Sequence, residues 1–179
     1  DGSVKKYLIQ PIDMIGFLLL NRLAHKLVYY GVAIGPFALV FFLCRDFLPS
    51  MPSAETMIAF AISLVMAFFL GFFLETAIGL IGFWFLEVSS LLFVYMLFNF
   101  FFSGHMFPLD ILPYPWNHVC EALPLQYLAY FPAAVWLGKI EGETLITALW
   151  IESAWVLFFI IVCRIAFNRG VKRYSGFGG

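Results

Sequence analysis

Four long apolar stretches limit what this chain can fold into. They cover residues 27–43, 56–83, 88–107 and 144–167 and contain few charged side chains. A helix that crosses the hydrocarbon core of a bilayer needs about 20 mostly apolar residues. The composition agrees, because 63% of the residues are hydrophobic and only 12% are charged, whereas a soluble domain carries about 25% charged residues. The sequence therefore predicts an all-α integral membrane protein with about four transmembrane helices.

The basic residues predict the orientation of these helices, because cytoplasmic loops are enriched in Lys and Arg. Only Arg45 and Lys139 fall in the two loops on the side opposite to the chain ends. The others precede the first stretch, or end or follow the last one: Lys5, Lys6, Arg22, Lys26, Arg164, Arg169, Lys172 and Arg173. We therefore expect both ends of the chain, including the tail at 168–179, to lie in the cytoplasm.

The segment before the first apolar stretch, residues 1–26, has a different pattern. Pro11 interrupts it, and apolar residues recur near helical spacing among polar ones. This pattern is typical of an interfacial helix on the cytoplasmic face of the membrane. Such a helix serves either as a membrane-surface anchor or as a docking element for a cytoplasmic partner. Further along, Pro36 is predicted to kink the first transmembrane helix.

Residues 108–142 combine an apolar composition with five prolines, which excludes both a solvated loop and a regular spanning helix. Short re-entrant or interfacial helices on the outer face of the membrane fit this combination. Non-helical backbone at membrane depth is tolerated only where protein buries it or where it lines a cavity. The sequence therefore predicts an outer re-entrant segment here.

Polar residues inside the apolar stretches are candidates for a substrate pathway, because each ionisable one costs roughly 2.5–3.5 kcal/mol to insert. Glu152 lies eight residues after Thr144, which is about 12 Å along a helix and near the middle of the membrane. It could contact a cationic substrate, pair with a basic residue of a partner, or be protonated. Asn99 and Glu75 are the other pathway candidates, with Glu75 nearer the cytoplasmic end.

Catalytic signatures are missing from the sequence. It contains no GxxxxGK[ST] loop for ATP, no GxGxxG, no HExxH and no GxSxG. It also has no basic patch interleaved with aromatic residues, as nucleic-acid binding would require. We therefore expect neither an enzyme nor a nucleic-acid-binding protein, and no cofactor bound by this chain.

Four polar residues, His105, Asp110, His118 and Glu121, cluster in the predicted outer region. A metal site is conceivable there, but the spacing matches no known ligand pattern. Interfacial polar residues that cap short helices are the favoured interpretation, so no metal is expected.

The three cysteines, Cys44, Cys120 and Cys163, form no zinc pattern. A disulfide between Cys44 and Cys120 is possible in the predicted topology, although unpaired thiols are favoured.

Several short motifs carry a resemblance to a known family. They are Ser103-Gly104, the stretch from Phe107-Pro108-Leu109-Asp110 to Pro113, Leu123-Pro124, Tyr127, Tyr130-Phe131-Pro132 and Leu137-Gly138-Lys139, and finally Arg169-Gly170-Val171-Lys172-Arg173-Tyr174-Ser175. Together with Gly2-Ser3-Val4, Tyr7-Leu8 and Pro11, they make most of the chain resemble the permease subunits of ABC-2 type ATP-binding cassette exporters.

This resemblance implies a six-span protein, of which the chain would hold the last four spans, the first two preceding Asp1. Residues 1–26 would then be a cytoplasmic connection that touches a separate ATPase, with the coupling contacts at Val4, Lys5, Lys6, Tyr7, Leu8 and Pro11. The outer re-entrant segment would form a gate that includes Phe107, Pro108, Asp110, Pro113, Tyr127 and Tyr130.

The resemblance also implies partners. These are a dimer of cytoplasmic ABC ATPase subunits carrying ATP and Mg²⁺, a second permease subunit that is identical or a paralogue, and the lipid bilayer of the cell membrane. The alternative hypothesis is a non-transporting membrane assembly or anchoring protein, which would use the same cytoplasmic segment to recruit a partner.

Overall fold

The computed structural model describes residues 12–45, 51–85 and 87–173. The chain divides into two compact units, one of residues 1–50 with 176–179 and the other of residues 51–175. Helices make up the regular structure of the described residues, and no strand occurs among them. The prediction of an all-α protein is confirmed.

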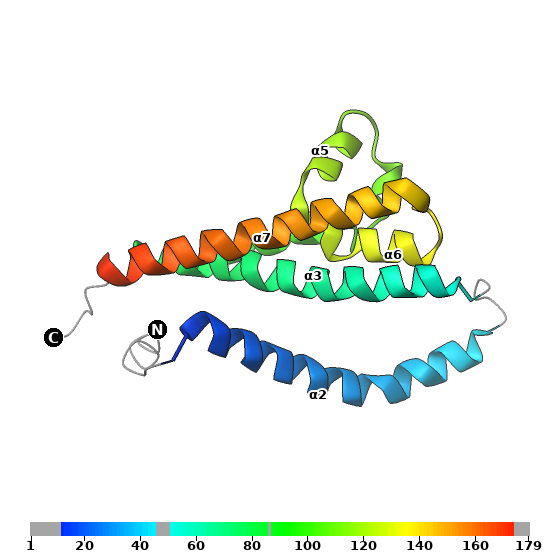
Figure 1. Cartoon of the computed structure of the whole chain (residues 1–179), viewed down its shortest axis with the longest axis horizontal. Helices are drawn as coiled ribbons and strands as arrows, with labels where there is room; N and C mark the ends of the chain where they lie inside the picture. The colour runs from blue at the N-terminus through cyan, green and yellow to red at the C-terminus, as the bar shows by residue number, and fades with distance from the viewer. Residues whose placement is uncertain (1–11, 46–50, 86, 174–179) are drawn as a thin grey trace. The chain divides into compact units, whose positions relative to one another are not determined.

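The first unit contains one long helix, α2 (Met14–Leu43). Asp13 caps its N-terminus by accepting a hydrogen bond from the backbone N–H of Gly16 at 3.1 Å. The helix continues through Pro36, and its ribbon is bowed (Figure 1). With 30 residues it is about 45 Å long.

No turn or loop separates the predicted interfacial helix ending at residue 26 from the predicted span beginning at Leu27, and the membrane boundary between them stays a prediction. The helix has no break at that point, so Arg22 and Lys26 lie within α2. The physical reason is the absence of a breaker: once a helix is nucleated, every further residue adds a hydrogen bond, and no Pro or helix cap stands between Met14 and Leu27. The earlier part of the predicted interfacial segment, residues 1–11, lies outside the described residues.

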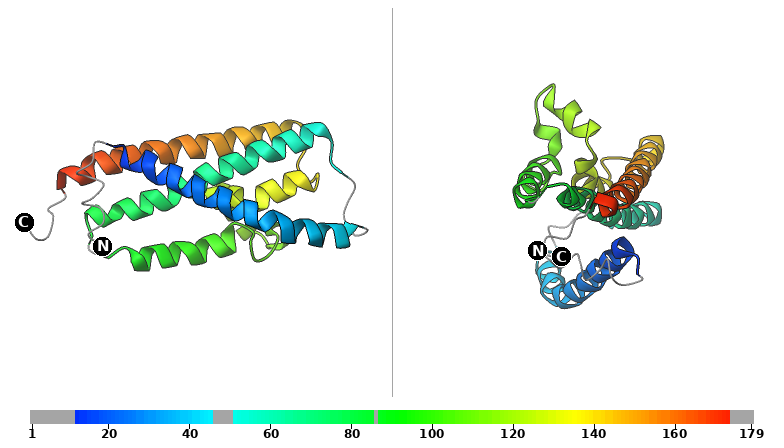
Figure 2. Two further views of the ribbon diagram at one scale, coloured as in Figure 1. Left: turned by 90° about the horizontal axis from the view of Figure 1, so that it is seen from below. Right: turned by 90° about the vertical axis from the view of Figure 1, so that its left-hand side faces the viewer.

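In the second unit, two long helices run parallel and side by side (Figures 1 and 2). The first is α3 (Ala54–Leu80), extended by the short 3₁₀ helix η2 (Ile81–Phe83). The second is α7 (Gly142–Arg173). Ser53 caps α3 by accepting from the backbone N–H of Thr56 at 3.2 Å.

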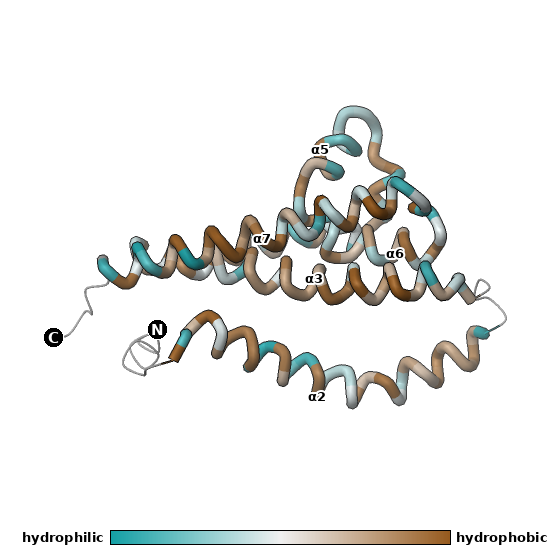
Figure 3. The backbone as a smooth tube through the Cα atoms, viewed as in Figure 1, coloured by the Kyte–Doolittle hydropathy of each residue, from teal (hydrophilic) through white to brown (hydrophobic). Residues whose placement is uncertain are grey.

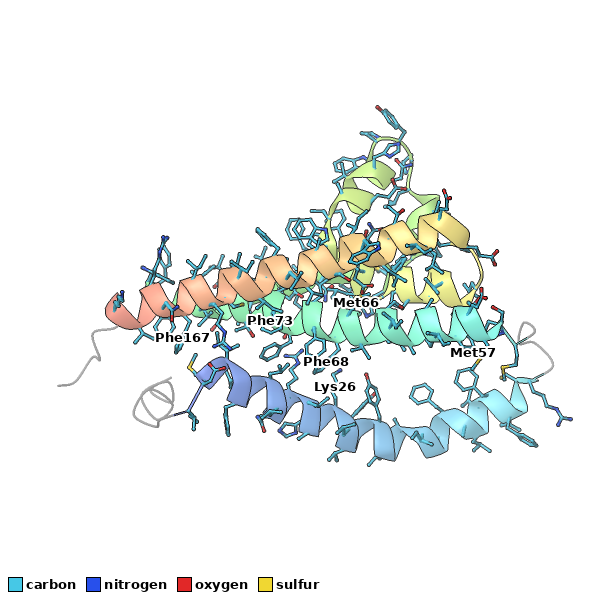
Figure 4. The ribbon with its side chains drawn as sticks, in the orientation of Figure 1. Lys26, Met57, Met66, Phe68, Phe73 and Phe167 are labelled. Atoms are coloured by element: carbon cyan, nitrogen blue, oxygen red, sulfur yellow. The ribbon has the colours of Figure 1, made fainter. Side chains whose placement is uncertain are left out.

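Three contacts fix the register of α3 and α7, at successive levels along the pair. Ser153 Oγ donates to Met66 Sδ at 3.1 Å, and Cys163 Sγ donates to the carbonyl oxygen of Phe73 at 3.1 Å. Beyond them, the rings of Phe167 and Phe83 meet with centroids 6.1 Å apart. Figure 4 labels Met66, Phe73 and Phe167 along the two helices.

The helix α4 (Ser89–Phe102) follows α3 and runs back in the opposite direction (Figure 2). The predicted span at 88–107 is longer than this helix, whose 14 residues extend only about 21 Å. The helix stops because Gly104 adopts a φ of +87°, a conformation that glycine adopts readily. In addition, the carbonyl of Ser103 accepts from the backbone N–H of Tyr130 at 2.8 Å. The alternating directions of α3, α4 and α7 agree with the predicted up-and-down order of spans.

Short helices fill the predicted re-entrant segment between α4 and α7. They are η3 (Leu109–Ile111), α5 (Trp116–Ala122), η4 (Pro124–Leu128) and α6 (Tyr130–Trp136). In Figure 1, α5 projects from the end of the α3–α7 pair where α7 begins. The expectation of short helices is therefore met, while their depth in a membrane stays a prediction.

The hydrophobic core of the second unit lies where η4 and α6 pack against α3 and α7. Its buried residues are Ala59, Leu70, Tyr127, Phe131 and Val135. Rings reinforce it, since Phe60 and Trp136 lie 4.9 Å apart and Tyr127 and Phe131 lie 5.2 Å apart between centroids. The core thus packs η4 and α6 against both long helices.

Among the described residues, three helices are long and apolar enough to cross a membrane: Met14–Leu43, Ala54–Phe83 and Gly142–Lys172. Figure 3 shows the hydropathy along them, with apolar stretches in the helix bodies and polar residues at the C-terminal end of α7. The predicted spans 56–83 and 144–167 fall within the second and third of these helices.

Candidate functional site

The candidate site is the connecting segment, residues 103–141, which joins the end of α4 to the start of α7. Its first fixed point is Gly104. A Cβ atom at this position would lie 2.7 Å from the Cβ of Tyr130, closer than real Cβ contacts allow. The glycine therefore lets the start of α6 approach the end of α4, where the Tyr130 N–H binds the Ser103 carbonyl.

A three-residue cluster, Asp110 with Tyr130 and Lys139, closes the segment on itself. The Tyr130 hydroxyl donates to Asp110 Oδ1, and Lys139 Nζ donates to Asp110 Oδ2 at 2.5 Å. Asp110 comes from η3, Tyr130 from the first position of α6, and Lys139 from the loop before α7. One carboxylate therefore connects three parts of the segment that are 20 and 29 residues away in the sequence.

The electrostatics of the cluster favour the ionised carboxylate. The hydrogen bond from the Lys139 ammonium, followed by that from the Tyr130 hydroxyl, holds the pKa of Asp110 below its usual range. Burial, and then the hydrogen bond to Asp110, raises the pKa of the Tyr130 phenol above its usual range. At neutral pH the cluster is thus an ion pair with a neutral tyrosine.

Beside this cluster lies an open pocket of about 220 Å³. Its wall is largely apolar and includes Met106, Phe107, Pro108 and Leu137, while Tyr130 and Lys139 provide polar groups. The pocket is therefore suited to an apolar group with a polar end, which the ion pair can contact.

The structure brings together four of the six predicted gate residues and separates two. Phe107, Pro108 and Tyr130 line the pocket, and Asp110 binds Tyr130. Tyr127 instead lies in the hydrophobic core, and Pro113 is exposed away from the lining. The predicted gate did not include Lys139, which belongs to the cluster with Asp110 and Tyr130. Its position as a lone cation in an otherwise apolar region could have indicated that it pairs with a nearby carboxylate.

The three predicted pathway residues lie on three different helices. Glu152 of α7 is fully buried, whereas Asn99 of α4 and Glu75 of α3 are half-buried. Glu75 is nine residues beyond Met66, the residue that contacts α7 next to Glu152, and is therefore about 14 Å further along. A pathway role for these residues stays a prediction.

The polar residues considered for a metal site are engaged in separate interactions. His118 Nδ1 pairs with Glu121 Oε2 at 3.1 Å, and His105 Nδ1 hydrogen-bonds the Ser103 hydroxyl. Asp110 belongs to the ion-pair cluster. They act as side-chain pairs rather than as the helix caps that the sequence favoured, and no group of three potential ligands converges within the described part of the chain.

The cysteines in the described residues, Cys44, Cys120 and Cys163, are all free thiols. The coupling residues Val4, Lys5, Lys6, Tyr7, Leu8 and Pro11 lie outside the described residues.

Taken together, the long apolar helices and the short-helix segment that joins α4 to α7 define an all-α membrane protein. A model of the family described as ABC-2 family transporter protein matches residues 1–178. The chain therefore belongs to the ABC-2 transporter family, and this membership supports a permease-type role in membrane transport. No curated protein and no solved structure matched the chain.

Proposed function

We propose that this chain forms the membrane-spanning permease of an ABC-2 type exporter, lines the substrate pathway and couples to a separate cytoplasmic ATPase. The observation that carries the proposal is the family match over residues 1–178, on a chain with three helices long enough to cross a membrane. The absence of a GxxxxGK[ST] loop from the sequence supports the placement of ATP and Mg²⁺ on a partner subunit.

In this proposal, coupling uses Val4, Lys5, Lys6, Tyr7, Leu8 and Pro11 at the cytoplasmic surface of the cell membrane. These residues shortly precede α2, which begins at Met14 and is continuous for 30 residues. Because helices are stiff, a displacement of the preceding segment by the ATPase would be passed to the far end of α2. A second permease subunit, identical or paralogous, would complete the pathway.

The gate would be the connecting segment. Its Asp110 ion pair with Lys139 is about half exposed, with side-chain exposures of 45% and 46%. An exposed pair of this kind contributes only about 0–1 kcal/mol, so it can open and close at little cost. A weak, specific contact of this kind suits a gate that opens and closes better than it suits a permanent structural contact.

The test is co-expression of the protein with an ABC ATPase subunit, followed by purification and measurement of ATP hydrolysis in proteoliposomes. We expect a stable complex whose ATP hydrolysis depends on the membrane subunit. A double charge reversal at Lys5 and Lys6 should weaken complex formation, whereas reversal of Lys172, an exposed cation near the end of α7, is the matched control.

Two outcomes would contradict the proposal. The first is no complex with any ABC ATPase subunit tested. The second is a complex without transport of any substrate and without coupled ATP hydrolysis, which would favour an assembly or anchoring protein. If the reversal at Lys5 and Lys6 and the reversal at Lys172 weaken complex formation equally, Lys5 and Lys6 have no specific coupling role, and the rest of the proposal is unaffected.

A further inference from the structure

Glu152 occupies the centre of the face with which α7 packs into the second unit. Leu145 and Leu149 precede it on that face and Val156 and Phe159 follow it, all four packed against the hydrophobic core. These spacings are those of one side of a helix. Glu152 is 0% exposed, so a carboxyl group stands where the pattern calls for an apolar side chain.

Neither carboxyl oxygen of Glu152 has a hydrogen-bond partner among the described residues. Three other polar side chains of the same unit are engaged elsewhere. The single hydroxyl proton of Ser153 is shared between Leu149 O and Met66 Sδ, Ser63 Oγ donates to the carbonyl of Phe60, and Gln126 Nε2 donates to the carbonyl of Glu121. Glu152 is therefore enclosed without any of these donors.

Within the second unit, the charged groups that the structure describes lie far from Glu152 along the helices. The titratable group of η4 in the same core is the phenol of Tyr127. On α6, Tyr130 is bound to Asp110. On α3, the charged residues Glu55 and Glu75 lie at least nine residues from Met66, which contacts Ser153 beside Glu152. On α7, the nearest charged residues, Glu143 and Arg164, lie at least nine residues from Glu152. Nine residues correspond to about 14 Å along a helix.

Within the described part of the second unit, an ionised carboxylate in this position would be shielded from solvent and would have no hydrogen-bond donor and no nearby counter-charge. Burial of such a charge costs more free energy than burial of an unsatisfied neutral polar group. The neutral acid is therefore the form compatible with this packing, whether the surroundings of the helix pair are lipid or protein.

We propose that Glu152 is a proton-binding site inside the α3–α7 pair, occupied when the inward face of α7 is packed on η4 and α6. Loss of the proton leaves a charge that the packed face cannot accommodate. Deprotonation is thus linked to separation of α7 from the connecting segment and to the entry of water. The site takes a proton as its ligand, and the inference does not depend on the identity of a transported substrate.

Infrared difference spectroscopy of the purified protein in lipid nanodiscs tests the proposal directly. At pH 7 we expect a protonated-carboxyl carbonyl band that shifts in D₂O and is absent from Glu152→Gln. The matched control is Glu143→Gln, which changes an exposed carboxyl nine residues earlier on α7 and should leave the band in place. A wild-type spectrum at pH 7 without the band, or with a band that survives in Glu152→Gln, overturns the proposal.

Stability against pH gives a second readout, by unfolding in mixed micelles containing increasing sodium dodecyl sulfate. A group that is protonated when folded and ionised when unfolded makes stability fall as pH rises. The ratio of folded to unfolded wild-type protein, compared with that of Glu152→Gln, should therefore fall by up to tenfold per pH unit. This fall is expected between the pH at which Glu152 ionises in the unfolded protein and the higher pH at which it ionises in the folded protein. Parallel curves for the two proteins from pH 4 to 9 overturn the proposal. If Glu152→Gln does not fold, the protonated-carboxyl band of the wild type is followed from pH 4 to 9 instead. Absence of this band over the whole range would mean that Glu152 is ionised throughout and would refute the proposal.

Discussion

Replacement of Gly104 by alanine probes how the connecting segment is held against α4. Two costs are expected. Alanine at the φ of +87° pays about 1–2 kcal/mol for a left-handed backbone. Its Cβ would also lie 2.7 Å from the Tyr130 Cβ, and overpacking of this kind costs about 1–3 kcal/mol. The sum is about 2–5 kcal/mol.

Gly142→Ala is the matched control for this substitution. Gly142 has a φ of +60°, but a Cβ there would meet nothing within 4 Å. Gly142→Ala therefore incurs only the backbone cost, and the stabilities of the two variants should differ by about 1–3 kcal/mol. At about 2–4 °C per kcal/mol for a chain of this size, the apparent Tm of Gly104→Ala should lie about 2–12 °C below that of Gly142→Ala.

A thiol-reactive dye can follow this unfolding, because Cys120 and Cys163 are buried and become reactive when the protein opens. Cys44 is exposed, so a Cys44→Ser background removes its constant signal. Equal losses of Tm in Gly104→Ala and Gly142→Ala would refute the reasoning, because the close approach of Tyr130 would then contribute nothing.

Two further substitutions test the packing and the ion pair. Gly170→Ala places a Cβ 2.4 Å from the ring of Phe83, whereas Gly79→Ala meets nothing within 4 Å, so thermal unfolding should show a lower Tm for the first than for the second. If both raise the Tm through helix propensity, close packing of α7 on η2 is not needed. Asp110→Asn should lower stability at pH 7 by less than about 1 kcal/mol, because the ion pair is half exposed. Folding lowers the pKa of Asp110, so the stability that its carboxylate contributes is complete above the unfolded pKa of about 3.9 and is lost as pH falls from there through the folded pKa. A difference in Tm between the wild type and Asp110→Asn that persists unchanged at pH 3 would contradict this account.

Patterns that act locally in the sequence were sufficient for the long helices. The apolar stretches at 56–83 and 144–167 lie within two helices of membrane-spanning length because twenty apolar residues in succession satisfy their backbone only as a helix. The helix is unbroken at the boundary predicted at residue 26, since polar residues on a helix do not interrupt its hydrogen bonds; where a membrane begins along it stays a prediction. The helix at Ser89–Phe102 is shorter than the span predicted at 88–107, because the turn at Gly104 is fixed by the contact between Ser103 and Tyr130.

The candidate site divides in the same way. Asp110, Tyr130, Phe107 and Pro108 were predicted together because they stand in one recognisable segment. Lys139 stands in the same segment, but only the fold brings its ammonium to the carboxylate of Asp110, 29 residues away in the sequence.

The sequence by itself thus determined the class of this protein, because the length of the apolar stretches and the motifs of the ABC-2 family can both be recognised within short windows. Only the tertiary structure decided which polar groups meet and which stay alone. Asp110 found two partners because η3, α6 and the loop before α7 converge. Glu152 found none, because the periodicity of α7 turns it into an apolar core, and the energy of a charge depends on its three-dimensional surroundings.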